Sequence, residues 1–316
     1  MKGRFAPSPT GRMHLGNIYS ALLSWLSVRS QDGAWVLRIE DIDPQRSRRE
    51  FAEQIKDDLR WLGLDWDEEY TQSDRFDIYE QYLQLLKAKG LVYPCYCSRA
   101  DIMATQAPHE SDGRIVYAGT CRPQSLRNPL TIAPTQTSQP HQTLQTAQTP
   151  PRLPSLRLFV PDEEIAFTDA HYGPQSVNLA THCGDFILRR ADGAWAYQLA
   201  VVVDDALMDI TEVVRGRDLL LSAPQQIYLY QLLGFPAPTF CHLPLLCNEA
   251  GQRLCKRDKS LDLGELRKHH SAEEVLGVLA HLANITPSPA PISAQELIPL
   301  FSWQKVPTED IKVNIC

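Results

Sequence analysis

The stretch from Arg4 to Asn17, RFAPSPTGRMHLGN, combines residue types that could bind a nucleoside triphosphate. A strand-like start leads into a Pro/Gly loop, and His14 and Gly16 stand where an amphipathic helix begins. A helix N-terminus offers unpaired N–H groups and the positive end of the helix dipole, which would stabilise an anion there. Gly16 lets a ligand approach the backbone closely. Because a bare His-x-Gly-Asn is more often an ordinary strand–turn–helix junction, the flanking residues must decide.

Those flanking residues resemble the class I aminoacyl-tRNA synthetases, and specifically the glutamyl-tRNA synthetase family. The first signature of that family reads APSPTGxxHxGN and is matched from Ala6 to Asn17. The resemblance covers residues 3–265 apart from a Pro/Gln/Thr-rich insert. It implies ATP binding by Pro7, His14, Gly16 and Asn17, with His14 and Gly16 also taking part in catalysis.

A basic segment late in the chain resembles the second signature of these enzymes. That signature is KMSKS, usually KLSKR in the glutamyl family, and Gly251 to Arg257 reads GQRLCKR. Lys256 takes the position of the second lysine, where an ammonium group can neutralise charge on the β- and γ-phosphates as pyrophosphate leaves. Arg253 replaces the first lysine by a guanidinium fork, and Cys255 replaces a hydroxyl donor. The resemblance assigns ATP binding to Arg253 and Lys256 and catalysis to Lys256, whereas RLCKR alone would be a surface loop.

An enzyme that activates glutamate must pair the side-chain carboxylate with a cation and the α-ammonium with an acceptor, because unpaired charges are costly to desolvate. The resemblance implies six positions for this pocket: Arg4, Ala6, Ser8, Glu40, Tyr197 and Arg215. Glu40 suits the ammonium, and Arg215 suits the carboxylate. Without the resemblance, Arg215 would equally be a structural ion pair and Tyr197 a half-buried strand residue. Ala206 stands where the family usually has a histidine.

Three cysteines could form part of a metal site. Cys95 and Cys97 stand at CxC spacing, and Cys121 follows Tyr117 at YxxxC spacing. Two cysteines cannot complete a tetrahedral site, so further ligands are needed. In the tRNA-modifying branch of the family a CxC and a YxxxC bind zinc, which implies one structural Zn²⁺ held by Cys95, Cys97, Tyr117 and Cys121. His109 is an alternative fourth ligand, and the residues could also hold no metal.

The length of the chain favours the same branch. Glutamyl-tRNA synthetases usually continue into a long helical anticodon-binding region, and residues 258–316 are too few for it. The tRNA-modifying branch activates L-glutamate with ATP and Mg²⁺ in the absence of tRNA, and transfers it to queuosine at the wobble position of tRNA(Asp). The implied partners are ATP, L-glutamate and queuosine-containing tRNA(Asp). Two alternatives remain: a truncated ordinary synthetase that charges tRNA(Glu), and a non-catalytic, synthetase-like regulator that binds RNA or protein.

Composition limits where such a protein works. With 316 residues and 43% hydrophobic residues, the chain can bury the core of one large domain with appendages. The start MKGRFAPS has no apolar signal core and no run is long enough to span a membrane, so we expect a cytoplasmic location and no membrane partner. We also expect a monomer. The eight cysteines are then free thiols or metal ligands. Because the net charge is −7, any RNA contact must be local. The candidate basic clusters are Arg46 with Arg48 and Arg49, Arg189 with Arg190, and Arg253 to Lys259.

Hydrophobic periodicity indicates the elements that position these residues. A strand at 3–6, a helix at 17–29 with Asn17 as N-cap, and a strand at 34–39 ending before Glu40 form an opening βαβ unit. Two amphipathic helices at 48–62 and 75–89 should end at Gly63 and Gly90.

Later signals are more local. An Asp192-Gly193 turn predicts a hairpin between strands 186–190 and 194–197. Capping boxes should open three helices, the first of which ends at Gly234. These boxes are Ser222 to Gln225, Ser271 to Glu274 and Ser293 to Glu296. Residues 124–155, rich in Pro, Thr and Gln, are predicted to be a mobile linker.

Together these features predict an α/β protein. We expect a Rossmann-type class I catalytic domain, an inserted zinc-binding acceptor-type subdomain and a short helical C-terminal part. Residues 1–92 and 184–265 would be the two halves of the catalytic domain, 93–183 the inserted subdomain, and 266–316 the C-terminal region.

Overall fold

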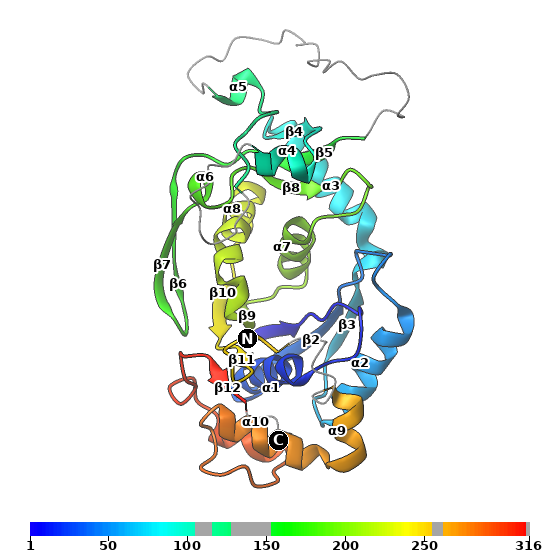
Figure 1. Cartoon of the computed structure of the whole chain (residues 1–316), viewed down its shortest axis with the longest axis vertical. Helices are drawn as coiled ribbons and strands as arrows, with labels where there is room; N and C mark the ends of the chain where they lie inside the picture. The colour runs from blue at the N-terminus through cyan, green and yellow to red at the C-terminus, as the bar shows by residue number, and fades with distance from the viewer. Residues whose placement is uncertain (105–115, 128–152, 255–261, 314–316) are drawn as a thin grey trace.

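Five parallel strands form the central sheet of the computed structural model, which describes residues 1–104, 116–127, 153–254 and 262–313 (Figure 1). Their order is β10 (Thr239–Leu243), β9 (Glu212–Gly216), β1 (Lys2–Phe5), β2 (Ala34–Ile39) and β3 (Glu68–Thr71). The chain builds outward from β1 to β3 and later returns to the other side of β1. Strand order therefore reverses between β1 and β9, and ligands of parallel sheets bind at the carboxyl ends of strands at such a reversal.

The predicted opening βαβ unit is confirmed by β1, α1 (Leu15–Arg29) and β2. The predicted N-cap, Asn17, is wrong, because the helix begins at Leu15 and His14 caps it. The His14 ring nitrogen Nδ1 accepts the N–H of Gly16 at 3.1 Å, and the Asn17 side chain accepts the N–H of His14 at 3.2 Å. A histidine ring nitrogen thus takes the acceptor role that a side-chain oxygen of Ser, Thr, Asp or Asn usually has at this position.

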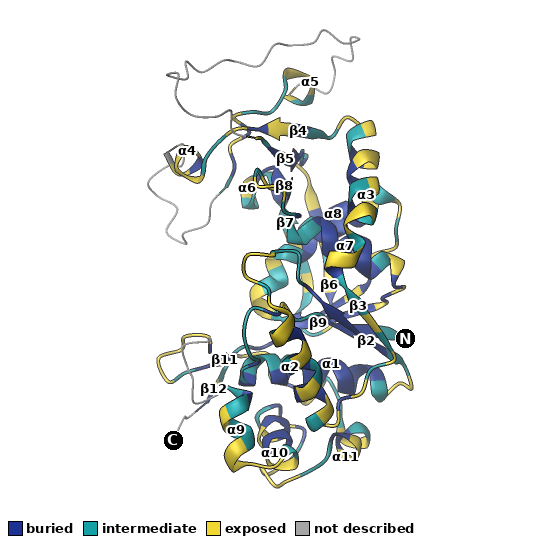
Figure 2. Cartoon of the chain, turned by 90° about the vertical axis from the view of Figure 1, so that its right-hand side faces the viewer, coloured by how far each residue is buried: buried dark blue, intermediate teal, exposed yellow. Residues whose placement is uncertain are grey.

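Helices cover both faces of the sheet. On one face α1 and α2 (Arg49–Trp61) share a hydrophobic core with the C-terminal helices, and on the other α3 (Phe76–Ala88), α7 (Tyr197–Leu207) and α8 (Ala223–Leu233) form a second core. Strand β2 is consequently buried on both sides, as Figure 2 shows for the interior of the sheet. The predicted helices α2 and α3 are confirmed, and Gly63 and Gly90 after them have positive φ angles.

The segment between the two halves of the central sheet has its own antiparallel sheet, formed by β4 (Val92–Cys95), β5 (Ser155–Leu158) and β8 (Phe186–Arg189). It also contains the helices α4 (Arg99–Ala104), α5 (Gln124–Arg127) and α6 (Leu179–His182). A hairpin of β6 (Glu164–Asp169) and β7 (Gly173–Asn178) descends from this region to β10 (Figure 1). Strand β8 lies in this sheet, although it follows residue 183.

One local prediction is confirmed only in part, and another is wrong. The second arm of the 186–197 hairpin is reduced to one bridge between Arg189 and Trp195, and Tyr197 instead begins α7. Ser222 does not form a capping box, because it ends the 3-10 helix η2 (Arg217–Ser222) in a helical conformation and makes no cap hydrogen bond. An N-cap residue must leave helical geometry, whereas here one helical turn runs into the next. Helix α8 does end at Gly234, as predicted.

The C-terminal region contains α9 (Leu263–His269), α10 (Ala272–Leu282), α11 (Ala294–Leu297) and η4 (Ile298–Leu300). Both predicted capping boxes, at Ser271 and Ser293, are confirmed. The short strand β12 (Ile311–Lys312) pairs with β11 (Leu246–Cys247) in a separate two-stranded sheet and ties this region to the segment that follows β10. Sequence patterns missed β12, β3 with the η1 turn (Gln72–Arg75) that follows it, and the β6–β7 hairpin.

Some predictions concern parts of the chain outside the described residues. Most of the Pro/Gln/Thr-rich segment, residues 128–152, is among them, as are His109, Cys255 and Lys256. Within the described ranges, no helix is long and apolar enough to cross a bilayer.

Candidate active site

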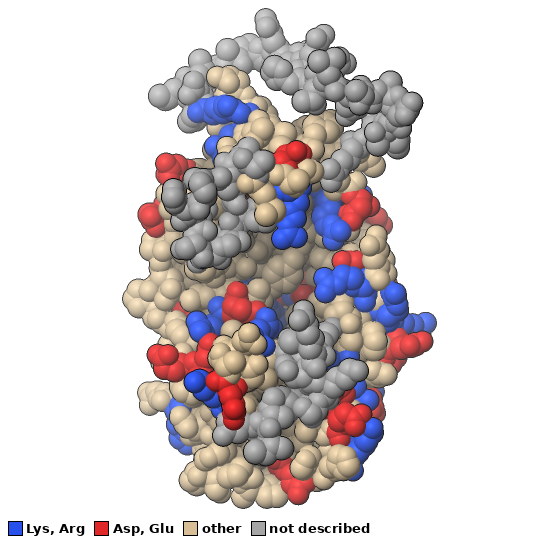
Figure 3. All heavy atoms as spheres, viewed as in Figure 1, with Lys and Arg blue, Asp and Glu red and all other residues tan. Residues whose placement is uncertain are grey.

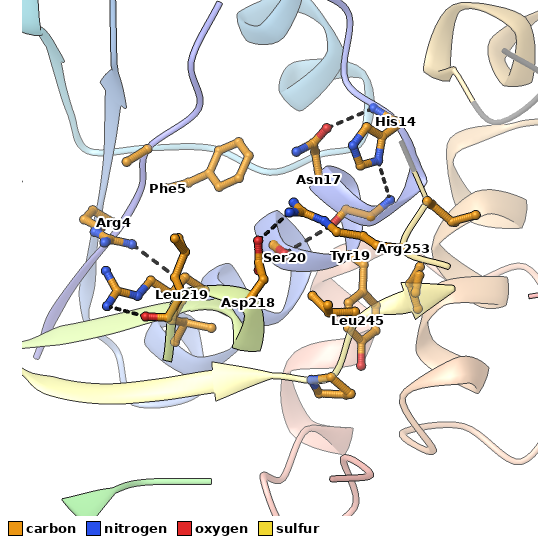
Figure 4. Close-up of a pocket in the computed structure, with 18 of the residues that line it drawn as sticks. Arg4, Phe5, His14, Asn17, Tyr19, Ser20, Asp218, Leu219, Leu245 and Arg253 are labelled. Carbon is orange, nitrogen blue, oxygen red and sulfur yellow. Dashed lines mark hydrogen bonds and ion pairs between the residues drawn. The ribbon is translucent and has the colours of Figure 1, made fainter. Parts of the chain in front are cut away.

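A pocket opens at the carboxyl ends of β1 and β9, where the strand order reverses (Figure 4). Eight of the predicted site residues line it: Arg4, Ala6, His14, Gly16, Asn17, Tyr197, Arg215 and Arg253. Figure 4 shows Arg4 at one end, and His14, Asn17 and Arg253 at the other. Pro7, Ser8 and Glu40 are not among the lining residues.

The end with His14 suits a polyphosphate. The His14 cap holds the first turn of α1, and the Ser20 hydroxyl donates to the Gly16 carbonyl at 3.1 Å. Arg253 reaches the same end of the pocket, where it pairs with Asp218 while about half of its side chain (53%) stays exposed. A helix N-terminus and a partly solvated guanidinium together stabilise negative charge.

The segment that carries Lys256 begins and ends beside the first signature. On one side, Arg253 and Leu254 line the pocket together with His14 and Gly16. The backbone there is held by a β-bridge between Arg253 and Cys247 and by the N–H of Leu254, which donates to the Leu246 carbonyl at 2.9 Å. On the other, Asp262 pairs with His14, and Leu263 donates to the Met13 carbonyl at 3.0 Å. The tertiary structure therefore brings the flanks of the second signature to the first, although they are far apart in sequence.

Buried charges surround Arg4 at the other end of the pocket. Arg38 donates to Asp205 at 2.6 Å and to Glu40 at 3.1 Å, and the Nε of Arg4 lies 3.4 Å from Asp205. Burial alone would raise the pKa of Asp205, but Arg38 and Arg4 lower it below its usual range. These carboxylates are thus committed mainly to Arg38, which makes Arg38 a structural counter-ion rather than a ligand-binding group.

Arg215 has a different environment, because its hydrogen-bond partners are all neutral. It donates to His242 Nε2 at 3.0 Å, to Gln226 Oε1 at 2.8 Å and to the Leu219 carbonyl at 3.2 Å. Burial and the nearby Arg4 lower the pKa of Arg215, while Tyr197 and the more distant charge of Asp205 only partly oppose this shift. Only 5% of Arg215 is exposed, and no described carboxylate lies within ion-pair distance of it. A carboxylate ligand would supply the missing negative charge.

Glu40 lies at the carboxyl end of β2, and burial raises its pKa from 4.5 despite the opposing effect of Arg38 and Arg4. If Glu40 binds the α-ammonium of an amino acid, the KM for that amino acid should rise on acidification, starting above the pH at which an ordinary glutamate titrates. Protonation of a group with a raised pKa stabilises the fold, so the effect would not reflect unfolding at this site. Glu40→Gln is the control, because glutamine does not titrate and the acid-dependent rise in KM should disappear in this variant. If the variant shows the same pH dependence of KM as the wild type, Glu40 does not have this role.

A cluster of sulfur atoms lies in the inserted segment. The Sγ atoms of Cys95, Cys97 and Cys121 lie within 4.8 Å of one another. The sulfurs of Cys97 and Cys121 are 3.5 Å apart, and the Tyr117 hydroxyl is 3.4 Å from Cys95 Sγ. Burial and the neighbouring Cys121 raise the pKa of Cys97 to about 12. The predicted alternative ligand, His109, lies outside the described residues.

These donors fit a zinc ion. Zn–S bonds of about 2.3 Å place the sulfurs of a tetrahedral site about 3.8 Å apart, close to the observed spacing. Tyr117 is nearly buried, and its hydroxyl oxygen accepts the N–H of Cys121 at 2.7 Å, so it faces the cluster. Three thiolates and a phenolate would complete four-coordination and fix β4 to the loop at Cys121.

We expect Cys121→Ser to reduce bound zinc from one ion per chain to nearly none and to lower the Tm, because structural zinc contributes folding free energy. Metal content by mass spectrometry of the native protein and thermal unfolding measure both effects. Cys183→Ser is the matched control, since this half-buried cysteine lies in the same segment outside the cluster. Equal zinc in wild type and Cys121→Ser would contradict the site; reduced affinity in Tyr117→Phe would identify Tyr117 as the fourth ligand.

The two arginines of one predicted basic cluster, Arg189 and Arg190, are held in ion pairs. Arg189 pairs with Glu80 at 2.7 Å, and Arg190 pairs with Asp192 at 2.6 Å. Figure 3 shows positive and negative side chains interspersed over the face it draws. RNA contact at these arginines stays a prediction, and their ion pairs would have to open for it.

Sequence reasoning missed three residues of this site. Asp205 is one of two adjacent acids in the otherwise apolar AVVVDDAL, and such a pair is a signal for a buried ion pair. His242 stands alone among apolar residues of β10, a pattern that more often marks a satisfied core histidine. Asp218, the partner of Arg253, is the second residue of η2 directly after β9 and carries no local signal.

Comparison with known proteins defines the class of this fold and site. The family model for the catalytic domain of class I tRNA synthetases (E and Q) matches residues 1–290. A crystal structure of a glutamate tRNA ligase from Elizabethkingia meningosepticum in complex with its amino acid is similar, with a TM-score of 0.78 and 27% identity. That similarity covers 99% of this chain and 66% of the ligase.

Curated relatives narrow the class further. Proteins named glutamyl-Q tRNA(Asp) synthetase are 47% identical in Symbiobacterium thermophilum and 44% identical in Nitratidesulfovibrio vulgaris. Each match covers 98% of this chain and 95% of the relative. The chain belongs to the glutamyl-Q tRNA(Asp) synthetase family of class I tRNA synthetases. The predicted family and its α/β catalytic fold are thereby confirmed.

Proposed function

We propose that this protein activates L-glutamate with ATP in the absence of tRNA, forming glutamyl-adenylate, and transfers the glutamyl group to queuosine at the wobble position of tRNA(Asp). The observation that carries the proposal is the state of Arg215, a buried cation whose bonded partners are all neutral. It shares one pocket with the helix N-terminus at His14. An acidic amino acid and a nucleoside triphosphate match these two ends. The names of the curated relatives agree with this substrate pair.

The pocket residues divide between the two substrates. Arg215 receives the side-chain carboxylate of glutamate, with Tyr197 beside it, and Arg4 and Ala6 line the same end. Glu40 receives the α-ammonium, for which its side chain would turn from Arg38, and Ser8 lies in the loop between these groups. Pro7, His14, Gly16, Asn17 and Arg253 hold ATP together with Lys256.

In the first step, an oxygen of the glutamate α-carboxylate attacks the α-phosphorus of ATP. A new P–O bond forms, the bond to the β-phosphate breaks, and pyrophosphate leaves. Lys256 and Arg253 neutralise charge that gathers on the leaving group, while His14 and the Gly16 backbone stabilise the phosphoryl oxygens. Mg²⁺ bound with ATP supplies further charge neutralisation at the phosphates. In the second step a nucleophilic group of queuosine attacks the activated carbonyl carbon, and AMP leaves.

The domain organisation of the proposal follows the predicted boundaries. Residues 1–92 and 184–265 form the catalytic domain, 93–183 the zinc-binding subdomain and 266–316 the C-terminal region. Support comes from the separate antiparallel sheet and the cysteine cluster of the inserted segment. Strand β8 follows residue 183 and so belongs in sequence to the second half of the catalytic domain, but it pairs with β5 of the subdomain. The two parts would therefore be joined through β8.

The test uses purified protein, ATP and labelled glutamate. We expect glutamate-dependent ATP–pyrophosphate exchange in the absence of tRNA, and transfer of label to queuosine-containing tRNA(Asp) but not to queuosine-free tRNA(Asp). Nuclease mapping should place the label at the wobble nucleotide. Label on the 3′-terminal adenosine of tRNA(Glu) would instead identify an ordinary glutamyl-tRNA synthetase. If the protein forms no glutamyl-adenylate, whichever tRNA is present, the result would favour a non-catalytic regulator.

A further inference from the structure

A line of three buried side chains leads from the β6–β7 hairpin to the pocket. Asp169, the last residue of β6, accepts a hydrogen bond at 2.6 Å from His242 Nδ1, and His242 Nε2 accepts one at 3.0 Å from the Nε of Arg215. Asp169 and His242 are fully shielded from solvent. Neither is among the residues that line the pocket. His242 is next to it through Arg215 and through the backbone of Leu219, both of which line the pocket.

The hydrogen-bond partners fix the protonation state of His242. An arginine Nε–H can only donate, so His242 Nε2 must accept and the ring proton must lie on Nδ1. Asp169 Oδ2 receives that proton's hydrogen bond. Burial lowers the pKa of His242, which agrees with a neutral ring. Asp169 holds the histidine in one tautomer, and only in that tautomer can the histidine accept from Arg215 and fix its orientation.

Asp169 is itself held in place by the backbone. Its Oδ1 accepts the N–H groups of His171 at 3.0 Å and Tyr172 at 2.9 Å, and that of His242 at 3.3 Å. The turn that follows docks on the C-terminal region, because the Tyr172 hydroxyl donates to the Thr308 carbonyl at 2.7 Å. The inserted segment, the catalytic sheet and the C-terminal region thus meet at this carboxylate.

We propose that Asp169 and His242 are positioning residues that aim the Arg215 guanidinium at the side-chain carboxylate of glutamate, so that the inserted β6–β7 hairpin takes part in amino-acid recognition. The inference rests on the proposed glutamate site. Neither residue touches the substrate. Both act by fixing the orientation of the Arg215 guanidinium. A misaligned guanidinium keeps its charge but can no longer form two parallel hydrogen bonds with a carboxylate.

The substitution Asp169→Asn tests the positioning role without changing the size of the side chain. Because Oδ1 must still accept the backbone N–H groups, the amide NH₂ of asparagine would face His242 Nδ1. The ring proton would then move to Nε2, where it opposes the Nε–H of Arg215. The same tautomer argument explains the aspartate-to-asparagine effect in serine protease triads. The shape of the side chain stays nearly unchanged and one acceptor oxygen becomes a donor, so the orientation of Arg215 is lost.

We expect Asp169→Asn to raise the KM for glutamate in ATP–pyrophosphate exchange by roughly ten- to a hundredfold, as for loss of a charge-assisted hydrogen bond. The KM for ATP should change less than twofold. Asp185→Asn is the matched control: Asp185, directly before β8, is equally buried but accepts hydrogen bonds from Arg122 and Tyr93, away from Arg215. That variant should lose stability without a change in the KM for glutamate.

A double substitution tests whether Asp169 acts through His242. His242→Phe removes the acceptor for Arg215 and keeps an aromatic ring beside Phe240, against which His242 stacks. If the residues form one relay, Asp169→Asn combined with His242→Phe should have the KM of His242→Phe alone. Independent contributions would multiply instead and would contradict the relay.

A readout that needs no activity distinguishes this inference from the proposed function. Nitrogen NMR of histidine-labelled protein should show His242 protonated at Nδ1 in the wild type and at Nε2 in Asp169→Asn. Wild-type protein protonated at Nε2, or an unchanged glutamate KM in Asp169→Asn, would overturn the relay. Absence of any glutamate-dependent exchange by the wild type would overturn the proposed function, and the tautomers alone would then decide whether Asp169 positions Arg215.

Discussion

Replacement of Arg215 by methionine is expected to lower kcat/KM for glutamate by about a thousandfold, because removing one partner of a buried charge pair costs about 3–5 kcal/mol. The variant would leave the substrate carboxylate desolvated without a cation. Arg215→Lys should fall between wild type and Arg215→Met, since an ammonium keeps the charge but cannot bond three neutral acceptors and a carboxylate at once. Glutamate-dependent ATP–pyrophosphate exchange measures all three proteins.

The matched control for this result is Arg157→Met. Arg157 is as buried as Arg215, with 5% of each exposed, and it too bonds a neutral acceptor, the carbonyl of Asp185. It lies outside the pocket, over the ring of Tyr117. Its loss should lower the Tm and leave the KM for glutamate unchanged. Similar kinetic losses in both variants would mean that Arg215 is structural and not the carboxylate ligand.

Lys256→Ala is expected to reduce kcat of the exchange by about a hundred- to a thousandfold, the usual cost of one group that stabilises transition-state charge. The KM for glutamate should change little, because Lys256 is proposed to act on the leaving pyrophosphate. Lys268→Ala, in the exposed part of α9 where Lys268 pairs with Glu265, is the control and should retain full activity. An active Lys256→Ala enzyme would remove the second signature from the mechanism.

His14 needs a subtler substitution than alanine. Since its ring caps α1, His14→Ala would also cost about 0.5–2 kcal/mol of stability through the lost cap. Asparagine can retain the acceptor for the Gly16 N–H but lacks the ring nitrogen Nε2. We therefore expect His14→Asn to keep the Tm of the wild type and to lose exchange activity. Activity in His14→Asn would limit His14 to the capping role.

The inserted segment is connected to the amino-acid pocket as well as to the cysteine cluster. Sequence reasoning treated it as a metal-stabilised appendage, and the cysteine cluster fits that interpretation. The β6–β7 hairpin adds a second connection, because Asp169 reaches the hydrogen-bond partners of Arg215. Events at the inserted segment, such as docking of RNA, would therefore have a physical route to the amino-acid pocket.

Local features were predictable from the sequence by itself. The helices α2 and α3 and the capping boxes at Ser271 and Ser293 depend on contacts within a few residues, which hydrophobic periodicity and capping chemistry encode directly. In the opening βαβ unit each element carries its own local pattern, although β1 pairs with the more distant β2. The signature around His14 and the cysteine spacing are also local, so they identified the family and the sulfur cluster. Even there, the exact cap of α1 was missed, because a histidine ring is an uncommon cap acceptor.

The composition of the pocket was decided only by tertiary structure. Placing β9 beside β1 brings Arg215 close to Arg4, and that strand order is not encoded in any short window. Whether a buried arginine meets a carboxylate or only neutral acceptors depends on residues distant in sequence: Asp205 lies beside Arg4, whereas His242 lies beside Arg215. Residue type fixes the charge a side chain can carry, but the three-dimensional neighbours fix which charge is left for a ligand.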